Sequence, residues 1–339
     1  MTDAALSGPA DFAGATVLVC GTGLAGRTAV AALLDLGARV LVADDGGTPA
    51  PLPGAAEFLG RLTGLPAGVT AVFASPGLPP SHPVLAAAGV AGVPVLGELE
   101  LAWRIQGSRG PRWLLVTGTN GKTTTVRMLE SILRAAGLRA AAVGNVGVPV
   151  IDAVRARPGY DVLAVEASSF QLHFSSSLRP RAGALLNLAE DHLDWHGSMA
   201  AYARAKTKVW AGDRAVGNAD DPLVAELQAA SGAPRLDFTL GAPGPGRFGV
   251  AGGMLRTPDG VALLPVAEVA PAGPHNVANA LAAAALATAA GIGPAEIAAG
   301  LRAFVPDPHR NELVAEVAGV RYVDDSKATN PHAAAASLA

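Results

Sequence analysis

The sequence has little of what secreted, membrane-spanning or nucleic-acid-binding proteins rely on. A single cysteine, Cys20, among 339 residues excludes an internal disulfide framework and favours a reducing compartment. Met1–Ala10 carries an acid and no basic residue, which is not typical of a signal peptide. The most apolar stretch, Ala278–Ala290, is shorter than the roughly 20 residues that a membrane-spanning helix needs. The formal net charge is −3 and no long basic run occurs, so we expect a cytoplasmic protein with no membrane insertion and no nucleic-acid partner.

Aromatic residues are also scarce, at 4% of the chain, whereas half of all residues are apolar. The cores are therefore expected to consist of alanine, valine and leucine, with Cys20 as a small core residue in an apolar strand. A chain of this length exceeds one ordinary core, which predicts two or more domains.

A glycine-rich segment that ends in lysine and threonine is the most informative feature present. Val116–Thr124 follows an apolar strand pattern, Trp113–Val116, and precedes a helical pattern, Val126–Ala136. Backbone N–H groups of such a turn can surround phosphate oxygens, Lys122 can neutralise phosphate charge, and Thr123 can ligate Mg²⁺. Strand, loop and helix come in the required order, so the pattern favours a phosphate-binding loop over a surface turn, although it lacks the first glycine of the standard motif.

The first stretch of the chain has the layout of a dinucleotide-binding fold. A strand pattern, Thr16–Cys20, leads into Gly-x-Gly-x-x-Gly at positions 21–26. A helical pattern, Thr28–Leu36, and a second strand, Arg39–Val42, follow, and the acid Asp44 comes after them. This order indicates a nucleotide site in a Rossmann-like sheet.

Two further strand patterns complete this stretch. Val69–Ala74 ends in the turn Ser75-Pro76-Gly77, and Val93–Leu96 precedes an acidic helix start at Glu98–Glu100. Ligands of open α/β sheets bind at the carboxyl ends of the strands, so the turn at 75–77 is a candidate ligand contact.

The chain divides into three predicted domains. A Gly- and Pro-bearing linker, Gln106–Pro111, separates a Rossmann-like domain (residues 1–106) from a central domain (residues 107–304). The central domain alternates helices with apolar strand patterns, which suits a parallel sheet covered on both faces. We also expect a loop at Pro243–Gly253 and a buried helix at Ala278–Ala290. The candidate strands are Trp113–Val116, Ala140–Val143, Val162–Val165 and Ala184–Asn187.

Residues 305–339 predict only the start of a third α/β domain. They contain one strand pattern, Val320–Val323, and a polar segment, Asp324–Asn330, and the sequence stops within a helical pattern. One strand and one helix do not make a domain. We therefore expect the third domain to be incomplete, with exposed apolar surface at Val320–Val323 and His332–Leu338.

Three polar residues near strand ends or helices could carry chemistry. Glu166 follows Val162–Val165, where a carboxylate can hold Mg²⁺ near the phosphate loop or can cap a helix at the surface. His192 lies in an acidic turn and could be a metal ligand or a structural hydrogen-bonding residue. Lys206 falls in a helical pattern, Ala200–Trp210, where a solvated surface lysine is the ordinary interpretation.

Five segments occur in an order that resembles the Mur ligase family of peptidoglycan synthesis. They are Thr117–Thr124, Glu166–Leu172, Asn187–Asp194, His275–Ala280 and Asp324–Asn330. The second and the fifth most resemble the members that add D-glutamate, and the resemblance covers the chain from Thr16 onward. It implies an α/β fold with a Rossmann-like N-terminal domain, a central P-loop ATPase-like domain with a parallel sheet, and a truncated third domain.

The resemblance also implies a role for each matching residue. The catalytic residues would be Lys122, Glu166, His192 and Lys206, with Lys206 carrying a carbamate. Two Mg²⁺ ions would be held by Thr123, Glu166, His192 and Lys206. ATP would be bound by Gly118, Thr119, Asn120, Gly121, Lys122, Thr123, Thr124, Asn276, Asn279, Arg310 and Asp325. The uridine diphosphate of the substrate would contact Leu24, Ala25, Asp44, Ser75, Pro76 and Gly77. Its muramoyl-alanine end would contact Asn145, Ser168 and Gln171, and D-glutamate would face Lys327 and Thr329.

The implied activity is that of a monomeric, ATP-dependent acid–D-amino-acid ligase acting on UDP-N-acetylmuramoyl-L-alanine and D-glutamate. The substrate carboxylate would be activated as an acyl phosphate, which the amine of D-glutamate then attacks. Two other interpretations stay open. One is an inactive or fragmentary nucleotide-binding protein of the same family, because most of the third domain is missing. The other is an NAD-dependent dehydrogenase, suggested by the glycines at 21–26, which leaves the phosphate loop unexplained.

Overall fold

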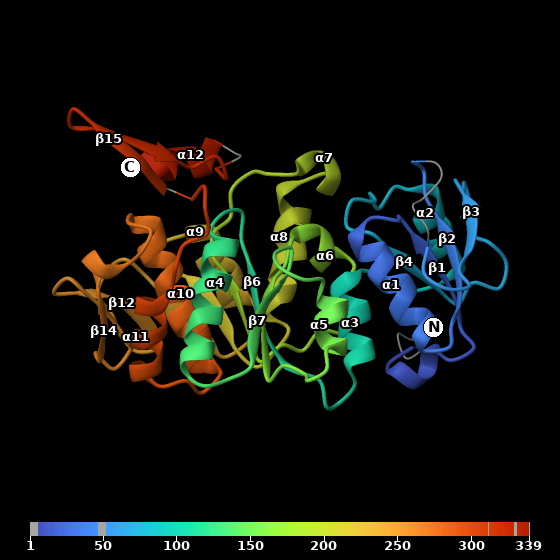
Figure 1. Cartoon of the computed structure of the whole chain (residues 1–339), viewed down its shortest axis with the longest axis horizontal. Coiled ribbons are helices and arrows are strands. Elements are labelled where there is room, and N and C mark those ends of the chain that lie inside the picture. Colours follow the sequence, from blue (N-terminus) through green and yellow to red (C-terminus); the bar gives the residue numbers. More distant parts are fainter. Residues whose placement is uncertain (1–5, 47–51, 311, 329–330, 339) are drawn as a thin grey trace.

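The computed structural model describes residues 6–46, 52–310, 312–328 and 331–338. Three sheets follow one another along the chain. Figure 1 shows the first sheet at the right, the central sheet in the middle and at the left, and a small hairpin above the central sheet. None of the helices in these ranges combines the length and the apolar character that a membrane crossing needs.

The first sheet has five parallel strands in the order β3-β2-β1-β4-β5. The predicted strands and the order strand, glycine turn, helix, strand are confirmed, although helix α1 begins at Leu24 and not at Thr28. Cys20 is buried in the core, as expected. The elements are η1 (Pro9–Phe12), β1 (Thr16–Cys20), α1 (Leu24–Asp35), β2 (Arg39–Ala43), β3 (Glu57–Gly60), β4 (Ala71–Ala74), α2 (Pro83–Ala91) and β5 (Val95–Leu96).

The central sheet has nine strands in the order β14-β13-β12-β11-β10-β9-β6-β8-β7. Strands β6 to β12 pair in parallel, and β13 and β14 add an antiparallel edge. The strands are β6 (Arg112–Thr117), β7 (Ala140–Gly144), β8 (Val162–Glu166), β9 (Ala182–Leu185), β10 (Ala215–Asn218), β11 (Arg235–Phe238), β12 (Arg247–Ala251), β13 (Met254–Arg256) and β14 (Ala262–Pro265).

Helices cover both faces of this sheet, which explains its continuous apolar strands. On β6, Leu114 and Val116 join the core beneath α4, α10 and α11, whereas Trp113 and Leu115 join the core on the opposite face. The helices are α4 (Lys122–Ala135), α5 (Val150–Arg155), α6 (Ser169–His173), α7 (Leu193–His196), α8 (Met199–Thr207), η2 (Lys208–Trp210), α9 (Pro222–Ala230), η3 (Val266–Glu268), α10 (Pro274–Ala289) and α11 (Pro294–Ala303).

One expectation for this sheet was wrong. The segment Pro243–Gly253 was expected to be a loop, but residues 247–251 form β12. Its neighbours explain the difference, because β12 pairs with β11 on one side and turns through Gly252 and Gly253 into β13 on the other. Pairing on both sides outweighs the weak strand propensity of a glycine-rich segment.

Helix α3 (Glu98–Gln106) joins the first sheet to the central sheet. It follows β5 directly and packs against α5 and α6 of the central part. A single core contains Val17 and Leu33 from the first part and Leu115 and Val165 from the central part. The two sheets therefore share buried apolar surface, and α3 fixes their relation.

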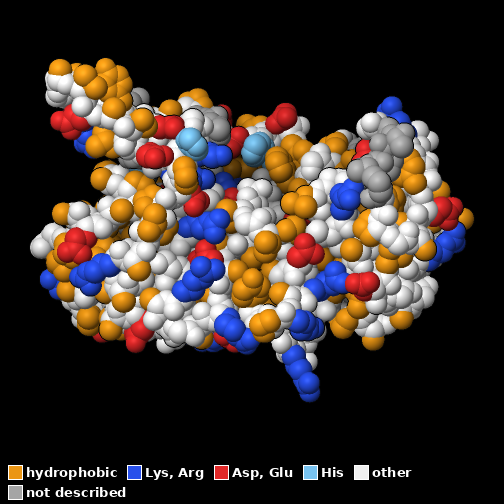
Figure 2. All heavy atoms as spheres, in the orientation of Figure 1, with side chains coloured by type: hydrophobic (Ala, Val, Ile, Leu, Met, Phe, Trp, Pro, Cys, Tyr) orange, Lys and Arg blue, Asp and Glu red, His pale blue; other side chains and the backbone are white. Residues whose placement is uncertain are grey.

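The third part is a hairpin followed by a helix. It comprises β15 (Glu312–Val317), β16 (Val320–Asp324) and α12 (Pro331–Leu338). The sequence had predicted β16 but not β15. Tyr322 is 54% exposed, as expected for the strand at 320–323, and Val314 on β15 is 66% exposed. Figure 2 shows hydrophobic side chains gathered on this hairpin.

Candidate active site

The phosphate loop links β6 to α4, as the sequence predicted. Gly121 caps α4 with φ +82, and a Cβ there would lie 2.4 Å from Oδ1 of Asn279, so only glycine fits. The Lys122 ammonium folds back over the loop and donates to the carbonyl oxygens of Gly118 (3.0 Å) and Thr119 (2.8 Å). Burial lowers the pKa of Lys122, while Glu166 opposes that shift. The loop thus places a cation beside backbone donors at a helix N-terminus, which is an anion-binding arrangement.

Asn187 holds this loop in place, a role that the sequence had not assigned to it. Its Oδ1 accepts from the backbone N–H of Asn120 (2.8 Å), and its Nδ2 donates to the Asn120 carbonyl (3.1 Å). The strand pattern had included Asn187, but β9 ends at Leu185, so the side chain is free to turn toward the loop. Asn187 therefore clamps both polar backbone groups of one loop residue.

A hydroxyl and a carboxylate meet at the carboxyl ends of β6 and β8. Thr123 Oγ1 donates to Glu166 Oε2 (2.7 Å), and Asn145 Nδ2 donates to Glu166 Oε1 (2.8 Å). Glu166 is 1% exposed, which excludes a surface role. A threonine hydroxyl and a carboxylate are hard oxygen ligands, so these two side chains fit Mg²⁺.

Lys206 is buried, not solvated, with only 2% of the residue exposed. Its Nζ donates to Gly118 O (2.8 Å) and Thr117 Oγ1 (3.3 Å), and lies 4.7 Å from the centroid of the Tyr202 ring. Burial, and then the charge of Lys122, lower the pKa of Lys206 well below its ordinary value. The two lysines thus donate to the same carbonyl oxygen, that of Gly118.

His192 contacts an aromatic ring and a neighbouring acid. Its ring centroid is 4.7 Å from that of Phe170, and its Nε2 is 3.5 Å from Asp191 Oδ2. Within the described ranges, the group of three acids or histidines close enough to share an ion is His309, Glu312 and Asp324, which does not include His192 or Glu166. Of the predicted metal ligands, the structure therefore joins Thr123 directly to Glu166.

Asp191 is an acid that the sequence did not single out as a site residue. Its charge acts on both Lys122 and Lys206 and opposes the loss of their protons. It precedes His192 in the turn after β9. Its position in the turn Glu190–Asp194 was the available sequence signal.

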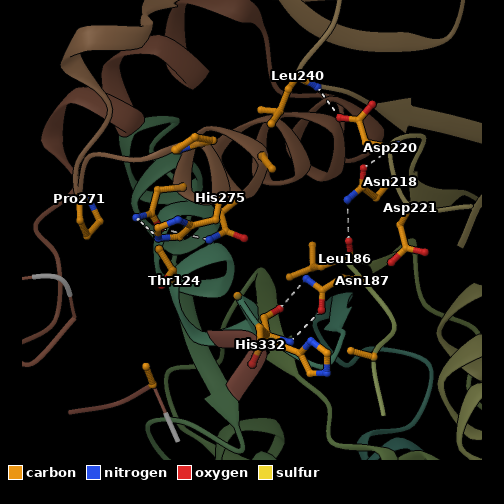
Figure 3. Close-up of a pocket in the computed structure, with 18 of the residues that line it drawn as sticks. Thr124, Leu186, Asn187, Asn218, Asp220, Asp221, Leu240, Pro271, His275 and His332 are labelled. Atoms are coloured by element: carbon orange, nitrogen blue, oxygen red, sulfur yellow. Dashed lines mark hydrogen bonds between the residues drawn. The ribbon is translucent and has the colours of Figure 1, made fainter. Parts of the chain in front are cut away.

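A cavity of about 570 Å³ opens beside the phosphate loop (Figure 3). It is lined by eight residues that the sequence had assigned to ATP or D-glutamate: Asn120, Gly121, Thr124, Asn276, Asn279, Arg310, Asp325 and Lys327. Thr329 lies outside the described residues. The structure adds Leu186, Asn187, Leu188, Ala189, Asn218, Asp220, Asp221, Phe238, Leu240, Pro271, Pro274, His275, Ala278, Ala328 and His332 to the lining. Its apolar walls and scattered polar groups suit a nucleoside.

The remaining predicted contacts gather at two places. Ser168 caps α6 by accepting from the Gln171 N–H (3.2 Å), and Gln171 Oε1 accepts from the Ser168 N–H (2.9 Å). In the first sheet, Asp44 Oδ2 accepts from both N and Oγ1 of Thr22 (2.6 Å each), and these bonds, led by the hydroxyl, lower the pKa of Asp44.

The other predicted first-domain contacts lie at the same edge. Leu24, Ala25, Ser75, Pro76 and Gly77 follow the carboxyl ends of β1 and β4. Ser75 Oγ donates to the Gly21 carbonyl (3.4 Å), which ties the two turns together. Leu24 is 68% exposed and therefore open to a ligand.

Comparison with known proteins agrees with this geometry. The family model of the Mur ligase middle domain matches residues 116–287. The UDP-N-acetylmuramoylalanine--D-glutamate ligase of Streptomyces coelicolor is 49% identical over 98% of this chain and 76% of its own length. The protein of the same name from Frankia casuarinae is 52% identical over 97% of this chain and 72% of its own length. The chain thus spans about three quarters of the length of these relatives.

Solved structures of lower identity share the fold. MurF from Acinetobacter baumannii gives a TM-score of 0.58 at 22% identity over 99% of this chain and 69% of that one. UDP-N-acetylmuramate-alanine ligase MurC from Thermotoga maritima gives 0.57 at 20% identity over 96% of this chain and 76% of that one. With the family match and the curated relatives, these likenesses lead to one conclusion: the chain belongs to the Mur ligase family.

Proposed function

We propose that this chain is an ATP-dependent ligase that joins D-glutamate to UDP-N-acetylmuramoyl-L-alanine in peptidoglycan precursor synthesis. The observation that carries the proposal is the phosphate loop, with Lys122 and Lys206 both bonded to its Gly118 carbonyl and with the Thr123–Glu166 pair at its end. The names of the relatives supply the substrate class. The alternative of an inactive or fragmentary nucleotide-binding protein is not favoured by relatives that are named as ligases.

The chain's own residues bind and orient the reactants. Lys122 and the loop N–H groups bind the β- and γ-phosphates of ATP, whose base and ribose occupy the 570 Å³ cavity near Asn276 and Asn279. The substrate carboxylate bonds to the γ-phosphorus and ADP leaves, which gives an acyl phosphate. The amine of D-glutamate then bonds to the acyl carbon, phosphate departs, and the amine loses a proton. Lys122 neutralises charge that develops on the phosphoryl oxygens.

Two Mg²⁺ sites are part of the proposal. Thr123 and Glu166 would hold the first ion, since their oxygens already converge. Glu166, His192 and a modified Lys206 would hold the second. Bound Mg²⁺ supplies neutralisation of phosphate charge and of the repulsion between two anionic reactants.

The environment of Lys206 supports its conversion to a carbamate. A lysine ammonium is a poor neighbour for Mg²⁺, because the two charges repel. Burial that lowers its pKa favours the neutral amine, which is the form that attacks carbon dioxide. A bond then forms between Nζ and the carbon, a proton is lost, and the product is an anion.

The division into residues 1–106 for the uridine diphosphate, 107–304 for ATP and 305–339 for the start of the ligase domain is proposed with the function. Asp44, Ser75 and Leu24 lie at one edge of the first sheet, where open α/β sheets bind nucleotides. The cytoplasmic location is proposed on the ground that both nucleotide substrates are intracellular metabolites. The monomeric state stays a prediction.

Calorimetric titration tests the substrate class. We expect UDP-N-acetylmuramoyl-L-alanine and ATP to bind, and NAD not to bind. Lys122→Met should weaken ATP binding by roughly tenfold or more, because it removes a charged partner of the phosphates. Lys208→Met is the matched control, since its Nζ donates to the His173 carbonyl outside the loop. Binding of NAD without binding of the UDP-sugar would refute the proposal.

A further inference from the structure

Glu98 is a buried acid between the first sheet and the proposed substrate site. It is the first residue of α3 and is 4% exposed. Its Oε1 accepts from the backbone N–H of Val150 (2.9 Å), and its Oε2 accepts from Gln171 Nε2 (3.0 Å). Both donors belong to the central part of the chain, whereas Glu98 follows directly from strand β5 of the first sheet.

Each of these bonds fixes a loop that carries a proposed substrate contact. Val150 is the first residue of α5, whose preceding residue, Pro149, offers no side-chain cap, so Glu98 caps this helix from another element. The loop before Val150 carries Asn145. Gln171 in turn holds the Ser168 N–H through its Oε1 (2.9 Å). Glu98 therefore fixes the loops of both Asn145 and Ser168.

The Gln171 amide is bonded within the fold through both its oxygen and its nitrogen. Its Oε1 faces a backbone N–H, so its Nε2 must face the carboxylate. The residue is 3% exposed. Gln171 thus connects Glu98 to Ser168 by hydrogen bonds at both ends of its amide.

The junction around Glu98 is tight. Gly97, the residue before it, donates its N–H to the Phe174 carbonyl (3.2 Å). A Cβ on Gly97 would lie 3.0 Å from Phe174 Cβ. Helix α3 is therefore packed closely against α6. A small displacement of Glu98 is expected to displace Gln171 and the Ser168 backbone that Gln171 holds.

We propose that Glu98 is a positioning residue for the muramoyl-alanine end of the substrate, acting through Gln171 and through the cap of α5. The inference rests on the proposed function. It assigns Glu98 no contact with substrate. Both carboxyl oxygens act as acceptors; burial raises the pKa of Glu98, and the bonds from Val150 and Gln171 oppose that rise.

Exchange of the two polar partners tests this hydrogen-bond chain. In Glu98→Gln, only one of the two positions is still an oxygen, so one of the two N–H donors faces an NH₂ group. In Gln171→Glu, two carboxylates face each other. In the double variant Glu98→Gln/Gln171→Glu, the new amide donates to the new carboxylate, while Val150 and Ser168 keep their acceptors. The double variant therefore restores all three bonds with the polarity of one reversed.

Glu100→Gln is the matched control. Glu100 lies on the same helix, is fully buried, and accepts from Ser176 and Ser177 and from Arg104. None of these residues is a proposed substrate contact. The substitution perturbs a buried acid of α3 without touching the chain from Glu98 to Ser168.

The measurement is calorimetric affinity for UDP-N-acetylmuramoyl-L-alanine and for UDP alone, with urea unfolding of each variant. We expect Glu98→Gln to weaken binding of the full substrate about tenfold and to leave UDP binding unchanged, because UDP lacks the muramoyl-alanine end. The double variant should recover to within about threefold of the wild type. Glu100→Gln should lose stability and keep both affinities.

Three results would overturn the inference. They are unchanged affinity in Glu98→Gln, equal loss of affinity for UDP and for the full substrate, and a double variant no better than the single ones. A wild-type chain that binds neither ligand would instead overturn the proposed function, and this inference with it.

Discussion

Gly26 sets how closely helix α1 approaches the turn that precedes it. A Cβ added at Gly26 would lie 1.9 Å from the carbonyl oxygen of Gly21 and 3.4 Å from Ser75 Oγ. Carbon and oxygen ordinarily approach to about 3.3 Å, so Gly26→Ala requires a shift of about 1.4 Å between helix and turn. The turn cannot yield easily, because the Gly21 N–H is bonded to the Ala43 carbonyl (2.8 Å) and Gly21 has φ +98.

The cost follows from the packing of α1. Ala29, Val30 and Leu33 of this helix are fully buried, so a shift of α1 disturbs the core of the first sheet. Overpacking of this kind costs about 1–3 kcal/mol. The higher helix propensity of alanine returns up to about 1 kcal/mol. We therefore expect Gly26→Ala to lower the free energy of unfolding by about 1–2 kcal/mol and to weaken binding of the UDP-sugar.

Gly23→Ala separates packing from ligand approach. Gly23 has φ −63, and an added Cβ meets no atom within 4 Å, so this variant should keep its stability. It should still weaken UDP-sugar binding if the diphosphate approaches the backbone here, as the second glycine of the motif permits. Urea unfolding and calorimetry with the UDP-sugar and ATP measure both effects. Equal stability of Gly26→Ala and the wild type would refute the packing argument. A loss of ATP affinity in Gly26→Ala would refute the claim that the disturbance is confined to the first sheet.

Three further predictions concern the central part. Gly300→Ala should destabilise the fold by about 1–2 kcal/mol in urea unfolding, because its Cβ would lie 2.3 Å from Ile132 Cα; a neutral result would contradict the packing of α11 on α4. Burial lowers the pKa of His196 to about 4, so the unfolded chain binds more protons between pH 6.5 and 4 and stability falls as the pH falls through this window. Solvent screening of this half-buried ring limits the effect to about 1 kcal/mol, and His196→Phe should flatten the pH dependence of unfolding; an unchanged slope would contradict the assignment. Asn187→Ala should weaken ATP binding about tenfold, because it releases both backbone groups of Asn120, and unaltered affinity would show that the loop holds its shape alone.

The sequence pattern was sufficient to predict those helices, strands and turns whose conformation depends mainly on neighbouring residues. The run Trp113–Val116, the glycine turn and the helix after it are adjacent in sequence, and so are the strand, glycines and helix of the first sheet. Hydrophobic periodicity and the backbone freedom of glycine act over a few residues. Strand β12 was not predicted from its own residues, because it forms by pairing with β11 and β13, which are other segments of the chain.

The sequence by itself determined the family, the phosphate loop and the strand ends that carry Glu166 and Asp44. The tertiary structure alone decided that Lys206 is buried and donates to one carbonyl and one hydroxyl oxygen. It also decided that Glu98 bonds to Gln171, 73 positions further along the chain. The physical reason is that a side chain's pKa and hydrogen-bond partners depend on which distant segments exclude water around it. The hydrophobic periodicity of one helix or strand does not specify which distant segments will pack around its side chains.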